Sequence, residues 1–246
     1  MTIRAALRLC RFLLQVAANS VVYFFTAAFA TTKEKRHARA AWMHYSARRH
    51  IKVFGCQVEI DGEIPTGGLL VSNHLSYLDI VLLGSVTPAV FVSKADVRGW
   101  PLFGWLATIS GTVFIERERR THVGEVNREI QNALDEGALV VVFPEGTSSD
   151  GTEVLPFRAS LLEPALRGGH EITVAHIAYE IADGDAKREV CYWGDHTFFP
   201  HLLNLLGKKS VRATLRFGKF QRTTDDRKEL AGQLREAVLA LKNSGV

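Results

Sequence analysis

The sequence predicts an α/β protein in which a layered sheet is flanked by helices. Short runs rich in Val, Ile and Phe alternate along the chain with longer amphipathic segments, a pattern typical of α/β layers. The 246 residues are 47% apolar and 23% charged, which allows a large core and is unlike the composition of disordered or repetitive chains. We therefore expect one folded domain at residues 53–246, preceded by a helical segment of different character at residues 1–52.

This N-terminal segment joins an uncharged apolar run to flanking cations. Residues 12–30 contain no charged side chain, which is about the length needed to cross a hydrocarbon core of roughly 30 Å at 1.5 Å per residue. Residues 1–60 hold ten Lys or Arg and two Asp or Glu, a net charge of +8, whereas the whole chain carries +4. Cations beside an apolar run favour a membrane surface with anionic head groups. No nucleic-acid partner is expected, because no DNA- or RNA-binding module is recognisable.

Three interpretations of the apolar run stay open. Because cations flank both ends, the run can span the membrane or lie in one leaflet as a monotopic or re-entrant anchor. The third is a signal peptide, with the Ala-Phe-Ala sequence at residues 28–30 as an acceptable cleavage site. Separately, three cysteines without CxxC spacing are typical of reduced thiols in the cytoplasm, and no disulfide is expected.

The remaining elements follow from local patterns. Strands are expected near residues 57–60, 69–72, 89–92, 112–115, 138–143, 172–179, 189–193 and 211–217. Helices are expected near residues 78–84, 102–109, 122–136, 160–166, 198–206 and 225–242. The last helix has the strongest signal, with Thr224 as its expected cap and one apolar face. The apolar side chains of residues 198–206 are expected to pack in the core, with an acyl tunnel or contact with the bilayer as the alternatives.

A histidine and an aspartate follow the second strand. His74 and Asp79 are five residues apart, a separation that would rotate two side chains by roughly 140° on an ideal helix, so a turn must bring them together. A carboxylate bonded to one imidazole nitrogen fixes the tautomer and leaves the other nitrogen to accept a proton. The pair therefore predicts a base that activates a hydroxyl group, and the alternative is an ordinary solvated turn.

Two further polar turns follow strand-like runs. Arg117 comes after residues 112–115, and Pro144 and Gly146 come after residues 138–143. Open α/β sheets bind ligands at the carboxyl ends of their strands. These turns are therefore expected to meet His74 at one edge of the sheet.

The three turns resemble the first three signature blocks of the glycerolipid acyltransferases. Asn73-His74 with Asp79, residues 111–117 and residues 143–147 match those blocks in order and spacing, and the resemblance extends over residues 55–181. Members that acylate lysophosphatidic acid are the most similar. The resemblance implies a glycerol-3-phosphate acyltransferase-like fold, in which a layered mixed sheet is flanked by helices.

The resemblance also implies roles for individual residues. His74 would deprotonate a lipid hydroxyl while Asp79 holds the imidazole, and Arg117 would bind the acceptor's phosphate through its planar fork of donors. Backbone amides after His74 or at Gly146 would stabilise the oxyanion. The other substrate-binding positions that it implies are Glu145, Gly146, Thr147, Lys94 and Arg158. No acyl-enzyme, cofactor or metal site is expected.

Two positions depart from the family pattern. Ser148 stands where many members have arginine, and His176 stands where the fourth block usually has proline. These differences concern the acceptor rather than the reaction. A single strand histidine is more often structural than a ligand contact.

The expected function is that of a membrane-associated O-acyltransferase of phospholipid metabolism, at the cytoplasmic face of a membrane. The acyl donor would be acyl-CoA or acyl-carrier protein, and the acceptor a lysophospholipid, first of all lysophosphatidic acid. The alternatives are another lyso-lipid, such as a lyso-ornithine lipid, or glycerol 3-phosphate. A non-catalytic lipid-binding membrane adaptor with the same fold is the alternative from outside the enzymes.

Overall fold

A seven-stranded mixed sheet forms the centre of the structure, a computed structural model that describes residues 2–27, 29–31, 34–116 and 120–244. The strand order is β1-β7-β6-β2-β5-β3-β4. The strands are β1 (Cys56–Asp61), β2 (Gly68–Ser72), β3 (Val90–Lys94), β4 (Val113–Ile115), β5 (Leu139–Val142), β6 (Ile172–Ile181) and β7 (Val211–Phe220).

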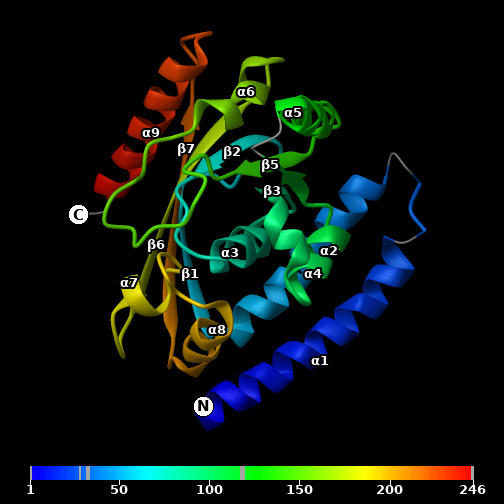
Figure 1. Cartoon of the computed structure of the whole chain (residues 1–246), viewed down its shortest axis with the longest axis vertical. Helices are drawn as coiled ribbons and strands as arrows, with labels where there is room; N and C mark the ends of the chain where they lie inside the picture. The colour runs from blue at the N-terminus through cyan, green and yellow to red at the C-terminus, as the bar shows by residue number, and fades with distance from the viewer. Residues whose placement is uncertain (1, 28, 32–33, 117–119, 245–246) are drawn as a thin grey trace.

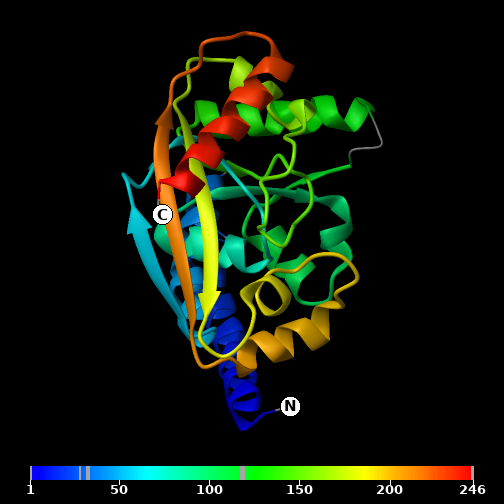
Figure 2. The same ribbon diagram turned by 90° about the vertical axis from the view of Figure 1, so that its left-hand side faces the viewer.

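Helices cover both faces of this sheet (Figures 1 and 2). The α-helices are α1 (Ile3–Thr26), α2 (Lys35–Val53), α3 (Leu78–Val86), α4 (Phe103–Ile109), α5 (Arg120–Asp135), α6 (Glu163–Leu166), α7 (Ala186–Glu189), α8 (Phe198–Gly207) and α9 (Arg227–Asn243). Two 3₁₀ turns, η1 (Ala95–Gly99) and η2 (Ala159–Leu161), complete the described elements. One apolar core joins the sheet to α1, α2, α3 and α8, and a second joins it to α5, α6 and α9.

The direction of the strands places their ends. β6 and β7 are antiparallel, whereas β6, β2, β5, β3 and β4 form a continuous parallel set. Their side chains alternate between the two cores, with Leu70 in the first and Leu69 and Val71 in the second. The carboxyl ends of β2, β5, β3 and β4 therefore lie at the same edge, where the sequence places its polar turns.

The expected α/β architecture is confirmed, with several local differences. The strand expected near residues 189–193 is absent there, because Asp185 caps the short helix α7 through the Lys187 N–H and the chain turns at Gly194, whose φ is +61°. The cap of α9 is Asp226 rather than Thr224, since Asp226 accepts hydrogen bonds from two amides of the first turn. Residues 160–166 divide into η2 and α6.

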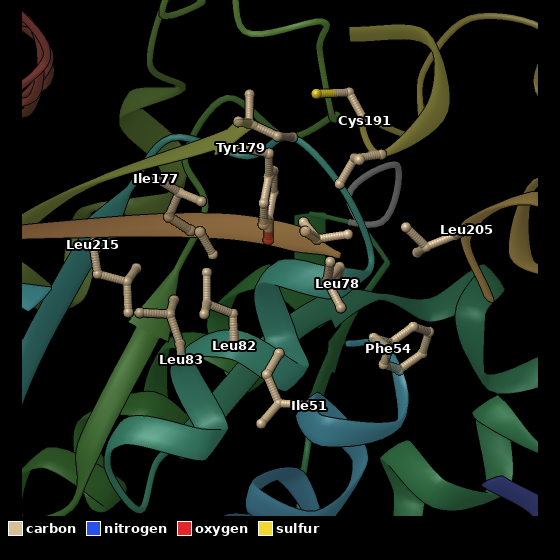
Figure 3. Close-up of a cluster of buried hydrophobic side chains, with 14 of the residues drawn as sticks. Ile51, Phe54, Leu78, Leu82, Leu83, Ile177, Tyr179, Cys191, Leu205 and Leu215 are labelled. Atoms are coloured by element: carbon tan, nitrogen blue, oxygen red, sulfur yellow. The ribbon is translucent and has the colours of Figure 1, made fainter. Parts of the chain in front are cut away.

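The N-terminal segment is a helical pair that packs against the sheet. α1 begins at Ile3, before the uncharged run, with the Thr2 side chain as its cap and three arginines in its first turns, and α2 carries six further Lys and Arg residues. Phe12 of α1 and Ile51 of α2 are buried in the same core as Leu82 of α3. Figure 3 shows Ile51 and Phe54 among the side chains of this core. α1 and α2 therefore share a core with the sheet and α3.

Candidate active site

The turn that carries His74 begins where β2 leaves the sheet. After Ser72 the chain departs from β6, and the Asn73 side chain takes over the pairing. Its Nδ2 donates to the Ile177 carbonyl at 3.0 Å, and its Oδ1 accepts from the Ile177 N–H at 2.7 Å. Two hydrogen bonds made by the Asn73 side chain therefore hold the start of the turn to β6. They replace the backbone pairing that ends with β2.

Asp79 holds the imidazole of His74 from inside the protein. The distance from His74 Nδ1 to Asp79 Oδ2 is 2.8 Å, and the side chains are 21% and 0% exposed. The same oxygen accepts from the backbone N–H groups of Leu75 (2.7 Å) and Ser76 (3.0 Å), while Oδ1 accepts from the Tyr179 hydroxyl at 2.6 Å. An ionised carboxylate only accepts hydrogen bonds, so this ring of donors fits the charged form. His74 then carries its proton on Nδ1, which leaves Nε2 as the basic nitrogen.

A tight turn explains how residues five apart converge. The Asp79 N–H donates to the Ser76 carbonyl at 3.1 Å and closes the turn that leads into α3. Phe143, at the carboxyl end of β5, stacks on the imidazole with ring centroids 4.3 Å apart and planes 20° apart. The ring of His74 is therefore fixed both by a hydrogen bond and by a packed face.

Glu145 supports the same turn from behind. Its side chain is buried, and its Oε1 accepts from the His74 backbone N–H at 3.2 Å. Burial raises the pKa of Glu145 from 4.5 to about 8, so the carboxyl is largely protonated at neutral pH. Gly146 follows with a φ of +73°, a conformation that strains any residue with a side chain.

His74 lines a cleft of about 280 Å³ at the carboxyl edge of the sheet. Lys94, Gly146 and Thr147 line the same cleft. Tyr192 and Trp193 from the segment after α7 also line it. This segment is held in place because the Tyr192 N–H donates to Leu75 O and the Ser148 hydroxyl donates to Tyr192 O.

An apolar cavity of about 130 Å³ adjoins the cleft. The two share Tyr77, Ile80, Ser93, Val97 and Trp100. The lining beyond these residues is mostly aromatic and aliphatic and comes largely from α1, α2 and α4, with Phe198 at the start of α8. A polar cleft that carries a base thus meets an apolar space enclosed in part by the N-terminal helices. This combination suits a ligand with a reactive polar centre and a hydrocarbon chain.

Comparison with known proteins decides the family. The family model described as Acyltransferase matches residues 56–180. The chain belongs to this acyltransferase family. It is 37% identical over 211 residues to a lyso-ornithine lipid O-acyltransferase of Brucella abortus (strain 2308), covering 79% of each chain.

Two further similarities extend this result. A 1-acyl-sn-glycerol-3-phosphate acyltransferase of Neisseria gonorrhoeae is 36% identical over 117 residues, which cover 48% of this chain and 46% of that protein. The crystal structure of the 1-acyl-sn-glycerophosphate acyltransferase PlsC from Thermotoga maritima superposes with a TM-score of 0.56 at 23% identity, covering 96% and 98% of the two chains. The expected family and fold are therefore confirmed.

Only some of the predicted site residues line the cleft. His74, Lys94, Gly146 and Thr147 line one cleft, and Asp79 lies directly behind it. Arg158 is exposed and lies outside the cleft lining, with its backbone N–H bonded to Pro144 O. The predicted phosphate ligand Arg117 lies outside the described residues.

The expected oxyanion donors are engaged elsewhere. The amides of Leu75 and Ser76 donate to Asp79, and the Gly146 amide donates to Phe143 O at 3.1 Å. In the structure as described, these three N–H groups serve the turns themselves. Which backbone amides stabilise a developing oxyanion therefore stays a prediction.

His176 lies away from the cleft. It is buried on β6, and burial together with Lys242 and Arg216 lowers its pKa from 6.5 to about 4. A neutral, buried ring fits the structural interpretation. Among the residues that the structure describes, no group of three His, Cys, Asp or Glu is placed to hold a metal ion.

Two residues that shape the site, Phe143 and Tyr179, had no predicted role of their own. Phe143 was part of a matched block, but its stacking on His74 required the register between β2 and β5. Tyr179 lies 100 residues from Asp79 in a strand with an ordinary apolar pattern. Neither contact has a local signal that sequence patterns detect.

Proposed function

We propose that this protein is a membrane-associated O-acyltransferase that transfers a fatty acyl chain from a thioester to the free hydroxyl of a lyso-lipid, with His74 as the general base. The observation that carries the proposal is the bond from His74 Nδ1 to the buried Asp79, in a side chain that lines the cleft. It leaves Nε2 to take the hydroxyl proton.

The reaction follows from these parts. Nε2 of His74 removes the hydroxyl proton as the oxygen attacks the thioester carbonyl carbon, and the buried Asp79 carboxylate stabilises the imidazolium that forms. When the tetrahedral intermediate collapses, the carbon–sulfur bond breaks. The thiolate leaves and takes the proton from His74. The products are the acylated lipid and a free thiol, without a covalent enzyme intermediate.

We place the acyl chain of one substrate in the apolar cavity. A cavity of about 150 Å³ lined by apolar side chains takes up a benzene molecule, so the 130 Å³ here suits on the order of five or six chain carbons. Burial of these carbons would direct the thioester or hydroxyl toward His74. Lys94 in the cleft, and Arg117, are the proposed contacts for an anionic head group.

For the acceptor we favour a lyso-ornithine lipid, with lysophosphatidic acid as the second candidate. Relatives named for lyso-ornithine lipid match 79% and 74% of this chain, whereas the Neisseria relative named for 1-acyl-sn-glycerol-3-phosphate matches 48%. Ser148, in place of the arginine of many family members, also lowers the positive charge available to a phosphate. This order reverses the one expected from the resemblance alone.

The N-terminal helices support membrane association. By its length and composition alone, α1 is long enough and apolar enough to cross a membrane. It exposes Leu7, Leu14 and Phe25 on one side, and Arg8 binds the carbonyls of Leu206 and Lys208 at the end of α8. A helix tied to the catalytic domain in this way fits an anchor that lies in one leaflet, at the cytoplasmic face where acyl thioesters are made.

A panel assay tests the function. The purified protein in lipid nanodiscs is given acyl-CoA or acyl-carrier protein with lyso-ornithine lipid, lysophosphatidic acid or glycerol 3-phosphate, and thiol release and product mass are measured. We expect acylation of a lyso-lipid, fastest with lyso-ornithine lipid, and its loss in His74→Ala. No thiol release with any pair, with unchanged lipid binding by His74→Ala, would favour the membrane adaptor instead.

A further inference from the structure

The hydroxyl of Tyr179 reaches the catalytic turn from the opposite side of the core. Tyr179 is buried on β6, and its ring points toward the start of α3, near Leu78 (Figure 3). Its hydroxyl lies 2.6 Å from Asp79 Oδ1. Burial and the neighbouring Asp79 raise the pKa of Tyr179 well above its ordinary value, so the phenol stays protonated and donates.

The two oxygens of Asp79 are served differently. Oδ2 accepts from His74 Nδ1 and from the N–H groups of Leu75 and Ser76, all within the same turn. Oδ1 accepts from Tyr179, which belongs to another element. Rotation of the carboxylate about its Cβ–Cγ bond moves both oxygens. The bond from Tyr179 to Oδ1 therefore adds a restraint from outside the turn to those on Oδ2, and helps to set the direction in which Oδ2 meets the imidazole.

The same strand holds both ends of the turn. Ile177 of β6 pairs through its backbone with the Asn73 side chain, and Tyr179, two residues later on the same face, holds Asp79. Residues 73 and 79 bracket His74. The imidazole is therefore positioned by β6 at both sides, once by backbone and once by the phenol.

We propose that Tyr179 is a positioning residue for acyl transfer, whose hydroxyl orients Asp79 and through it the imidazole of His74. The proposal rests on the proposed role of His74 as the base. It assigns to β6 a direct part in the geometry of the reaction, beyond its place in the sheet. The hydroxyl itself touches neither substrate, since Tyr179 is buried and lies outside the cleft lining.

The test is Tyr179→Phe in the full-length protein. The ring and its packing remain, and only the hydrogen bond to Asp79 is lost. We expect kcat to fall by about tenfold to a hundredfold, the range for one hydrogen bond to a charged group, while KM for both substrates stays within about twofold. The downfield proton NMR signal of the His74 ring N–H, assigned by its loss in His74→Ala, is expected to shift or broaden.

Two control variants separate orientation from folding. Tyr23→Phe removes a tyrosine hydroxyl on α1, outside the cleft lining, and is expected to leave kcat unchanged. Tyr179→Leu removes the ring as well and is expected to lower the melting temperature several degrees further than Tyr179→Phe, which loses only the hydrogen bond to Asp79.

Two results would overturn the proposal. One is a Tyr179→Phe protein with wild-type kcat and an unmoved His74 proton signal. The other is a loss of kcat matched by a loss of folding as large as that of Tyr179→Leu. If His74→Ala keeps full activity, the proposed base fails instead. The NMR arm is read without turnover, so it still reports whether Tyr179 orients the ring.

Discussion

The catalytic turn and the α1–α2 pair are built in opposite ways. Around His74 and Asp79, hydrogen bonds from Tyr179, Leu75 and Ser76 meet the buried carboxylate, and each has a distance of 3.0 Å or less. Between α1 and α2, Trp42 Nε1 donates to the Asn19 carbonyl at 2.7 Å, but the side-chain nitrogen and oxygen of Asn19 and the Ser46 hydroxyl are buried with no hydrogen-bond partner among the described residues.

Exposure separates the two regions further. Asp79 is fully buried, whereas α1 leaves Ile3, Leu14 and Phe25 exposed by 82%, 72% and 74%. Large exposed apolar patches mark surfaces that bind other apolar material. Several directional bonds converge on the part that reacts, whereas the part proposed to meet lipid depends mainly on non-directional burial, with a few hydrogen bonds from Arg8 and Trp42. Each region should therefore fail in its own way when it is changed.

The largest effect is expected from Asp79→Asn. An amide at this position presents an N–H group to donors and no longer holds His74 in the tautomer with the proton on Nδ1. We expect kcat to fall by about 10³- to 10⁴-fold, as for other bases that lose their orienting carboxylate. Thiol release under saturating substrates measures it. A decrease of less than tenfold would show that the carboxylate does not serve the base.

The membrane face is tested by Leu14→Gln combined with Phe25→Gln. Both side chains are exposed on α1, and transfer of such side chains from water to an apolar phase contributes about 1.5–3 kcal/mol each. We expect vesicle binding to weaken at least about tenfold in a flotation assay, with kcat on detergent-dispersed acceptor unchanged. Ile60→Gln with Ile64→Gln, exposed apolar residues near β1, is the matched control. Equal losses in both double variants would argue against a specific role for α1.

Ala107→Phe tests whether the apolar cavity holds the acyl chain. Ala107 lies on α4 and lines the cavity of about 130 Å³, so a phenyl ring would fill most of it. We expect the preferred acyl chain to shorten by about two to six carbons, read from competition between chain lengths. Thr108→Leu adds bulk at the next, exposed position and should leave the preference unchanged. An unaltered preference in Ala107→Phe would place the chain elsewhere.

The smallest effect is expected from Glu145→Gln, a change in the buried side chain that bonds the His74 backbone. The pKa of Glu145 is raised to about 8 by burial against 4.5 ordinarily, so the folded state binds this proton more tightly than the unfolded chain. The resulting stability is complete below about pH 4.5 and is lost as the pH rises through about 8. Glu145→Gln cannot ionise. We expect it to melt with the wild type near pH 5 and a few degrees above it near pH 8.5, by calorimetry. If the melting temperatures of the wild type and Glu145→Gln changed with pH in parallel, that result would contradict the raised pKa of Glu145.

Local patterns in the sequence predicted much of the fold, because β2, β5 and α9 each carry their own periodicity. The helix α2 had no such signal, since its buried face mixes Ala40 and Trp42 with Ser46 and His50, and residues 189–193 looked like a strand although a cap and a glycine turn decide their conformation.

In the candidate site, too, some features could be predicted from the sequence and others could not. The resemblance singled out His74 and Gly146, which line the cleft, and Asp79, which lies behind it, but residues in a shared motif do not reveal what supports them. The contacts of Tyr179 with Asp79 and of Phe143 with His74 join segments far apart in the chain. Such contacts depend on strand order and register, which no local pattern contains.

The proposal that Asp79 acts through the base His74 is tested most directly by a double-mutant cycle of His74→Ala and Asp79→Asn, with kcat for lyso-lipid acylation as the readout. Because Asp79 is held to act through the imidazole 2.8 Å away, the double variant should be no slower than His74→Ala alone. If the two losses multiply instead, Asp79 contributes without His74, and the base and its orienting carboxylate do not form the unit described here.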